Sequence, residues 1–234
     1  KKLKQVFINL QKAIRVQNRL DEKKLISMGY KGKIYNIPPF INIPKKTSST
    51  KSERFIALSV SRLSIKHKGI DLLCEVIEKT LNKTDKIIFY IVGSGDDGET
   101  LIRNLENKYP KNVKWFGFID ETILYKIYQR SNLFISTSRG ENFGINVGEA
   151  QISGLPTIAF DVMGSQDIIT NKIQGELIKP FDVNKFSNSI IKFYDFYNKN
   201  EAGYKNLKKK ISDISIKRYN YKLIIKLLIK MFID

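Results

Sequence analysis

The chain has 234 residues, of which 42% are hydrophobic and 11% aromatic, and its 41 Lys and Arg against 23 Asp and Glu give a formal net charge of +18. This length and apolar content favour a folded core over a disordered chain. The single cysteine excludes a disulfide framework and suits a reducing compartment, and no apolar run is long enough for a transmembrane helix.

The positive charge lies mostly at the two ends of the sequence. Residues 1–50 hold 12 Lys and Arg against 2 Asp and Glu, residues 201–234 hold 9 against 3, and the residues between them hold 20 against 18. A nucleic-acid-binding domain more often interleaves basic and aromatic residues through its folded body, so we expect no nucleic-acid partner. The basic ends are either solvated faces or surfaces attracted to an anionic membrane leaflet. The second interpretation predicts a cytoplasmic protein held peripherally at the inner membrane face.

The first fifty residues have a different pattern from the rest. A short helix, a strand at 33–37 and Pro38, Pro39 and Pro44 precede a Thr/Ser/Lys-rich stretch at 45–53. Prolines and small polar residues between apolar regions are typical of a linker. We therefore place a boundary near residue 45. Residues 1–45 are predicted to be the tail of an upstream domain and its linker, too short to form a core alone.

Strands and helices then alternate along the chain. Buried strands are predicted at 54–60, 86–95, 112–119, 132–137, 155–161 and 175–180. Helices are predicted at 69–81, 98–109, 121–131, 144–154 and 183–198. This alternation predicts an α/β fold, a Rossmann-like doubly wound parallel sheet over residues 46–200. Residues 201–234 are predicted to form basic, amphipathic helices.

Candidate anion-binding residues follow the predicted strands. Arg62 and Lys68 follow the first strand, Gly93 ends the second, and Gly144 opens a helix after the fourth. Ligands of open parallel sheets bind outside the carboxyl ends of the strands, so these residues should lie close together. Two cations beside a glycine at a helix N-terminus suit a diphosphate, because free N–H groups and the positive end of the helix attract an anion.

Two glutamates lie on either side of Gly144. Glu141 falls in the loop before the predicted helix and Glu149 about five residues into it. Carboxylates accept hydrogen bonds from neighbouring hydroxyls, so they suit sugar groups. A diphosphate flanked by two hydroxyl-binding carboxylates predicts a nucleotide-sugar, with ribose on one side and hexose on the other.

Four segments together resemble the carboxyl-terminal half of a family 4 glycosyltransferase of the GT-B fold. They are SVSRLSIKHKGIDLL, FYIVGSG, VKWFGFI and STSRGENFGINVGEAQISGLPTIAFD, which follow one another over roughly residues 54–180. The most specific feature is the pair of glutamates with seven residues between them, followed by Ala and a Ser-Gly-Leu-Pro turn. The preceding Arg-x5-Lys strengthens the resemblance.

The resemblance implies a retaining enzyme that needs no metal or other cofactor, with an acceptor-binding domain upstream. It places Arg62 and Lys68 on the donor diphosphate, Glu141 on the transferred sugar and Glu149 on the ribose. Arg62, Lys68 and Glu141 are its catalytic candidates. The backbone of Asn142, Phe143, Gly144 and Ile145 would meet sugar and phosphate, Gly93 would line the donor site, and Ile119 would lie near the base. Ser61 and Asn142 replace glycines that are usual in the family.

We therefore expect transfer of a sugar from a nucleotide-diphosphate-sugar to a glycan, lipid-linked or protein-linked acceptor, with this chain supplying mainly the donor-binding domain. The chain alone would then be inactive without the upstream domain. Two alternatives stay open. One is a non-catalytic nucleotide-sugar-binding module that acts with a partner chain, and the other is a basic nucleic-acid-binding protein. A nucleotide-sugar epimerase, whose fold is related, is a weaker third.

Other polar residues receive structural interpretations. Asp96 and Asp97 are predicted to cap the helix after the glycines, and His67 to be a solvent-exposed bystander. Glu141 has a capping-box alternative with Ser138. Cys74 is expected in the core.

The C-terminal stretch is apolar apart from three lysines on one predicted helix face, Lys222, Lys226 and Lys230. It is either a closing helix that crosses back onto the upstream domain or an interfacial membrane helix. An uncovered apolar face there would promote self-association.

Overall fold

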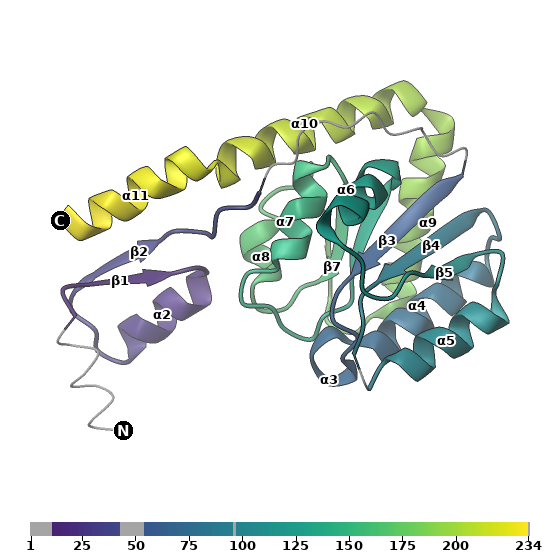
Figure 1. Cartoon of the computed structure of the whole chain (residues 1–234), viewed down its shortest axis with the longest axis horizontal. Helices are drawn as coiled ribbons and strands as arrows, with labels where there is room; N and C mark the ends of the chain where they lie inside the picture. The colour runs from purple at the N-terminus through teal and green to yellow at the C-terminus, as the bar shows by residue number, and fades with distance from the viewer. Residues whose placement is uncertain (1–10, 43–53, 96, 234) are drawn as a thin grey trace.

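The computed structural model describes residues 11–42, 54–95 and 97–233 (Figure 1). The predicted boundary near residue 45, the stretch at 45–53 and the predicted capping role of Asp96 lie outside these residues. Within them, no helix is long and apolar enough to cross a membrane.

The body of the protein is a six-stranded sheet in which every neighbouring pair of strands is parallel. Its strands are β3 (Phe55–Val60), β4 (Ile87–Val92), β5 (Val113–Trp115), β6 (Leu133–Ser136), β7 (Thr157–Phe160) and β8 (Gly175–Ile178). The order across the sheet is β5-β4-β3-β6-β7-β8. The strands are continuous apolar runs because helices cover both faces. The predicted fold class is confirmed.

Two hydrophobic clusters lie on opposite faces of this sheet, and helices cover both faces (Figure 1). One face carries α4 (Ile70–Leu81), α5 (Glu99–Lys108) and α9 (Val183–Lys199), and Cys74 packs there as predicted. The other carries α6 (Glu121–Arg130) and α7 (Ile145–Ile152). β3 supplies Ala57 to one cluster and Leu58 to the other, since successive side chains of a strand point to opposite faces.

Two helices of four residues are additions to the predicted elements: α3 (Ile65–Lys68) and α8 (Ser165–Ile168). Such short helices carry too few residues to show a helical period. The C-terminal region forms α10 (Glu201–Tyr219), which continues into α11 (Tyr221–Ile233). Figure 1 shows these two helices passing along the body and then reaching toward the N-terminal part of the chain.

The N-terminal part is a small unit of two parallel strands with a helix between them, β1 (Ala13–Val16), α2 (Arg19–Ser27) and β2 (Lys33–Asn36). The four-residue β1 was not predicted. The chain after β2 returns to the body, where Ile41 is 3% exposed and packs close to Gly148 of α7.

The strand order creates a switch point between β3 and β6. From β3 the chain builds β4 and β5 on one side and then returns to place β6 on the other. Connections on the two sides diverge at this point, which opens a crevice at the carboxyl ends of the two strands. The loops that follow β3 and β6 hold most of the predicted site residues, so the topology brings them together.

Candidate functional site

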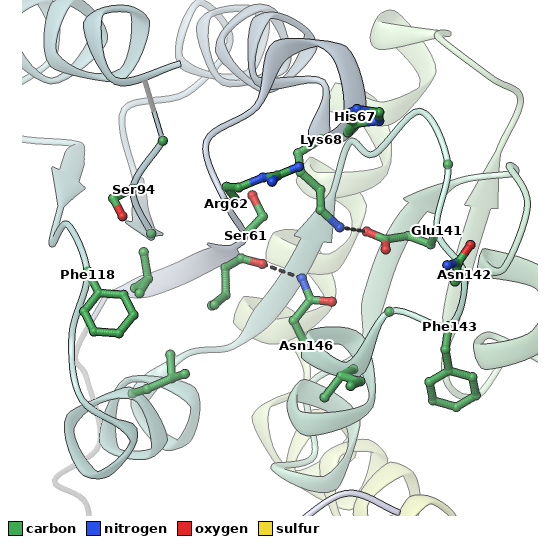
Figure 2. Close-up of a pocket in the computed structure, with 18 of the residues that line it drawn as sticks. Ser61, Arg62, His67, Lys68, Ser94, Phe118, Glu141, Asn142, Phe143 and Asn146 are labelled. Atoms are coloured by element: carbon green, nitrogen blue, oxygen red, sulfur yellow. Dashed lines mark hydrogen bonds and ion pairs between the residues drawn. The ribbon is translucent and has the colours of Figure 1, made fainter. Parts of the chain in front are cut away.

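A cavity of about 1000 Å³ opens at the carboxyl ends of β3 and β4, beside the N-terminus of α7 (Figure 2). Nine of the ten predicted site residues line it: Arg62, Lys68, Gly93, Ile119, Glu141, Asn142, Phe143, Gly144 and Ile145. Glu149 is not among the lining residues. Gln17, from the small N-terminal unit, lines the cavity as well.

Lys68 reaches the cavity because the loop after β3 is folded onto the loop after β6. Ser64 caps α3, and Gly69 ends it with a φ of 62°. A side chain at Gly69 would overlap the Thr137 carbonyl oxygen. The Thr137 hydroxyl donates to the carbonyl oxygens of Lys68 at 3.2 Å and Gly69 at 3.0 Å. This contact fixes Lys68 next to the residues that follow β6.

Glu141 already has two partners in the free chain. The Lys68 ammonium lies 2.5 Å from Glu141 Oε1 (Figure 2). The Ser138 hydroxyl donates to the same oxygen at 2.7 Å. The side chains of Lys68 and Glu141 are only 20% and 9% exposed. The capping-box alternative for Glu141 is wrong, because the next helix starts at Ile145 and its N-cap is Gly144. Ser138 instead holds the Glu141 carboxylate in place through its hydroxyl, a role that the sequence position of Ser138 did not reveal.

The two arginines near the cavity differ in what they contact. Arg62 is exposed, lines the cavity, and forms no ion pair with another residue in the described part of the chain. Arg139 is engaged by Asp71 through two bonds of 2.7 Å, and the guanidinium lowers the pKa of the Asp71 carboxyl. Arg139 therefore ties α4 to the loop after β6, whereas Arg62 remains available to an anion.

Gly93 lets the ends of β3 and β4 approach closely. Its φ is 132°, and a Cβ there would overlap the carbonyl oxygen of Ser61. Its carbonyl accepts from the Trp115 indole N–H at 2.9 Å, and its N–H donates to Gly117 at 2.8 Å. A larger residue at position 93 would push this rim of the cavity out of place.

The N-terminus of α7 faces the cavity without a side-chain cap. Gly144 has a φ of 74° there, and Gly144, Ile145 and Asn146 all line the cavity. The Asn146 amide donates to the Val60 carbonyl and so joins α7 to the end of β3 (Figure 2). The open amide groups and the positive end of the helix favour a bound anion. Asn146 is a further site residue that sequence reasoning missed.

Glu149 lies deeper in α7, where its carboxylate accepts a hydrogen bond of 3.0 Å from the Tyr128 hydroxyl. Burial raises the pKa of Glu149, and the Tyr128 bond partly opposes this by stabilising the carboxylate. Burial and the nearby Glu149 charge raise the pKa of Tyr128 well above its usual value. The pairing keeps a buried carboxylate hydrogen-bonded. Its predicted contact with ribose stays a prediction.

An apolar rim completes the cavity. Phe118 is 85% exposed and follows Gly117, while Ile119, Leu124 and Val92 line the adjacent wall. An exposed ring beside an apolar wall suits a flat group such as a base. Phe118 was not predicted as a site residue. Gly117, which turns the chain just before it, was the sequence signal that could have pointed to Phe118.

Two predictions about polar residues need correction or addition. Asp97 does not cap the helix that follows it, because its carboxylate accepts instead from the Ile65 N–H at 3.0 Å, the first amide of α3, beside the N-cap Ser64. The helix that follows, α5, begins at Glu99, and its N-cap, Gly98, provides no side-chain cap. His67 is exposed as predicted, but it also lines the cavity. Within the described ranges, no three His, Cys, Asp or Glu side chains are grouped so that they could hold a metal ion.

Known proteins match this chain over most of its length. Residues 41–210 match the sequence model of the family described as Glycosyl transferases group 1. A poly(ribitol-phosphate) alpha-N-acetylglucosaminyltransferase of Staphylococcus aureus is 31% identical over 160 residues, which is 68% of this chain and 32% of the relative. A poly(glycerol-phosphate) alpha-glucosyltransferase of Bacillus subtilis is 27% identical over 179 residues, which is 75% of this chain and 26% of the relative. The matched region thus spans about a third or less of these relatives.

Solved structures show the same fold. A mutant of TarM from S. aureus, in complex with fondaparinux, alpha-GlcNAc-glycerol and UDP, superposes with a TM-score of 0.82 at 24% identity, covering 100% of this chain and 47% of that one. The pneumococcal O-GlcNAc transferase GtfA, in complex with UDP and GlcNAc, gives 0.75 at 22% identity, covering 94% of this chain and 44% of that one. The chain belongs to the group 1 glycosyl transferases, and its parallel sheet with flanking helices is that of GT-B glycosyltransferases.

Proposed function

We propose that this chain supplies the donor-binding site of a retaining family 4 glycosyltransferase that uses a nucleotide-diphosphate-sugar without a metal ion. The observation that carries the proposal is the convergence of Arg62, Lys68 and the uncapped N-terminus of α7 on one cavity with Glu141. Three sources of positive potential in one crevice suit a diphosphate, and a carboxylate beside them suits sugar hydroxyls. The neighbouring Phe118 and Ile119 suit the base.

In this proposal the cations stabilise the leaving group. Breaking the bond between the anomeric carbon and the phosphate oxygen places negative charge on the departing diphosphate. Arg62, Lys68 and the first amide groups of α7 would stabilise that charge, and such preorganised electrostatics is usually the largest contribution to catalysis. Lys68 would turn from Glu141 toward the phosphate, which frees Glu141 Oε1 for a sugar hydroxyl. Ser138 would hold the carboxylate in place during this exchange.

The donor site is tested by calorimetric titration of the chain with UDP, GDP and ADP. We expect micromolar to millimolar binding of one of them, weakened in a Glu149→Ala variant that loses the ribose contact. The matched control is Glu75→Ala, because Glu75 is exposed on α4, pairs with Lys79 at 3.7 Å and does not line the cavity. The proposal is wrong if the folded chain binds none of the three, or if the control weakens binding as much as Glu149→Ala does.

The choice of acceptor and the anomeric stereochemistry of the transfer are properties of the whole protein. The two curated relatives act, by their names, on poly(ribitol phosphate) and poly(glycerol phosphate). We extend the proposal to a glycan, lipid-linked or protein-linked acceptor and to retention of the anomeric configuration. NMR of the product formed by the full-length protein would test this, since the anomeric coupling of the transferred sugar must match that of the donor. An inverted product would refute the retaining assignment.

The proposal also places α11 at an anionic membrane surface on the cytoplasmic side. Ile225, Ile229 and Phe232 are 47%, 53% and 81% exposed on this helix. Three exposed lysines, Lys222, Lys226 and Lys230, lie on the adjoining face of the same helix. An apolar face bordered by lysines suits anionic headgroups.

Cosedimentation with vesicles tests this placement. We expect binding to vesicles that contain phosphatidylglycerol, weaker binding to neutral ones, and a loss of binding in Ile229→Glu. Ile123→Glu is the control, because Ile123 is similarly exposed, at 45%, but lies on α6. If the chain ignores vesicles and instead forms dimers that Ile229→Glu dissociates, α11 is a self-association surface and the membrane placement is wrong.

A further inference from the structure

One asparagine of the N-terminal unit reaches the donor-site loop. Asn18 is 0% exposed and caps α2, with its Oδ1 accepting from the Asp21 N–H at 2.7 Å. Its Nδ2 donates to two acceptors, the Asp21 carboxylate at 2.8 Å and the backbone carbonyl of Asn142 at 3.0 Å. A fully buried amide is costly unless its polar atoms are paired, and here each has a partner.

The bond to Asn142 falls on the loop that carries Glu141. The same loop packs against the turn at Gly164, where a side chain would overlap the Glu141 carbonyl oxygen. The Glu141 N–H donates to the Met163 carbonyl at 3.0 Å in the same turn. The backbone of Glu141 and Asn142 is therefore held between Met163–Gly164 and Asn18.

A second contact joins the N-terminal unit to the body of the protein nearby, but it is an exposed ion pair and contributes less stability. The Arg19 N–H donates to the Asp167 carboxylate at 3.2 Å, and the two side chains pair at 3.8 Å. The Arg19 side chain is 78% exposed, and exposed ion pairs contribute little. Of these two contacts, the one made by Asn18 is buried, and it is the one that reaches the donor-site loop.

We propose that Asn18 is a positioning residue for the donor site: through its Nδ2 it fixes the backbone of Asn142 and so the place of the Glu141 carboxylate. This inference deepens the proposed function and rests on it for the role of Glu141. It makes the N-terminal unit part of the site, since the cavity is also lined by Gln17, the residue before Asn18.

Asn18 has two roles that substitution can separate. Asn18→Asp keeps an oxygen for the Asp21 N–H and so keeps the cap, but it removes the donor to Asn142. Asn18→Ser also keeps a capping oxygen, is too short to reach Asn142, and adds no charge beside Asp21. The matched control is Asn200→Asp, because Asn200 caps α10 through the Gly203 N–H at 2.8 Å and is exposed.

Hydrogen exchange of the Glu141 amide in the free chain is the direct measurement. We expect both Asn18 variants to raise its exchange rate about fivefold to tenfold, which corresponds to one hydrogen bond, while the amides of α2 and the control keep their rates. An unchanged Glu141 rate would overturn the proposal. So would a rise in both variants that the α2 amides share equally, because the loop would then follow the cap.

Nucleotide binding is the functional readout. In the calorimetric titration, we expect Asn18→Ser to weaken binding of the preferred diphosphate about fivefold to tenfold in a chain that is still folded at the temperature of the titration, although loss of the two Nδ2 hydrogen bonds lowers its unfolding temperature. Equal affinity in parent and variant would overturn the role of Asn18 while leaving the donor site in place. If the parent chain binds no nucleotide, the proposed function fails, and the exchange of the Glu141 amide still decides whether Asn18 positions the loop.

Discussion

Polar residues at the amino end of the central sheet are hydrogen-bonded within the protein, whereas some at its carboxyl end are free to contact a ligand. At the amino end, the Asn132 side-chain oxygen accepts from the Ile56 N–H at 2.9 Å, and the Asn132 backbone carbonyl accepts from the Tyr204 hydroxyl at 2.9 Å. The Lys208 ammonium donates to the Ser131 carbonyl at 2.7 Å. At the carboxyl end, Arg62 is exposed and α7 begins without a side-chain cap.

This difference separates stability from binding along the same strands. Polar groups at the amino end are bonded to the protein itself, so they hold helices onto the sheet. Groups at the carboxyl end keep hydrogen-bonding capacity that a ligand can use. Substitutions of the bonded groups at the amino end should therefore change the free energy of unfolding but not ligand affinity, and substitution of a group at the carboxyl end that is unpaired among the described residues, such as Arg62, should change ligand affinity but not the free energy of unfolding.

The largest expected effect is at Tyr204, which is 1% exposed and packs against Phe55, Phe196 and Tyr197 with ring centroids 6.2, 5.5 and 5.4 Å away. Tyr204→Ala should lower the free energy of unfolding by about 3–5 kcal/mol, because it empties an aromatic site in the core. Tyr204→Phe should cost about 1 kcal/mol, the value of the lost hydrogen bond. Urea unfolding measures both. A change in nucleotide affinity of the folded Tyr204→Phe variant would break the separation of the two ends.

The next effect is a pH dependence that originates at Lys208, whose pKa burial lowers from 10.5 to about 8. Below pH 8 the ammonium is charged in both states and its burial destabilises the fold in full. Between pH 8 and 10.5 the unfolded chain binds more protons, so stability rises with pH, by about 3 kcal/mol in total. Lys208→Met should lack this rise. The comparison is the unfolding free energy of both proteins at pH 7 and pH 10, and parallel behaviour would contradict the assignment.

At the carboxyl end, Arg62→Ala should weaken diphosphate binding roughly tenfold to a hundredfold, the value of a charge-assisted hydrogen bond. The unfolding free energy should stay within about 0.5 kcal/mol, because Arg62 is exposed. Lys66→Ala is the control, since Lys66 is exposed in the neighbouring helix α3 but does not line the cavity. Calorimetry gives the affinities. Equal weakening by both variants would show general charge attraction instead of a specific contact.

The sheet and most of the cavity could be predicted because their signals are local. The strands are short apolar runs that end in glycines and charges, and the switch point then brings the loops after β3 and β6 together. Gly144 at the start of α7 and the core position of Cys74 follow from the same patterns. The local pattern predicted one hydroxyl-binding carboxylate on each side of a diphosphate, and the family resemblance then assigned Glu141 to the transferred sugar and Glu149 to the ribose.

The missed features join residues that are distant in the sequence. Asn18 and Asn142 are separated by 124 positions, and Tyr128 and Glu149 by 21. Nothing near either residue of a pair marks its partner. The error at Asp97 has the same origin, since its neighbour in sequence is α5 but the turn after β4 lies against α3. The four-residue helices α3 and α8 are too short for a helical period to appear.

The smallest effect tests the buried carboxylate where the two ends of the comparison meet. Tyr128 is 0% exposed like a core residue, yet its hydroxyl bonds Glu149, which is predicted to bind ribose. Tyr128→Phe removes a bond that stabilises the ionised carboxylate, so the pKa of Glu149, already raised by burial, should rise further. Because only the carboxylate accepts two hydroxyl hydrogens, nucleotide affinity should fall as the pH drops through this pKa, and the variant should lose affinity at a higher pH than the parent. The loss should reach about fivefold where Glu149 is protonated in the variant and ionised in the parent, as expected for one hydrogen bond.

Titrations from pH 8 down to pH 5 follow the shift in the pKa of Glu149. Tyr125→Phe is the control, since the Tyr125 hydroxyl donates to the Asn42 carbonyl at 3.1 Å and not to Glu149. Identical pH profiles for parent and Tyr128→Phe would mean that Glu149 does not contact the nucleotide, and the ribose assignment would then have to be abandoned while the diphosphate site stands on Arg62 and α7.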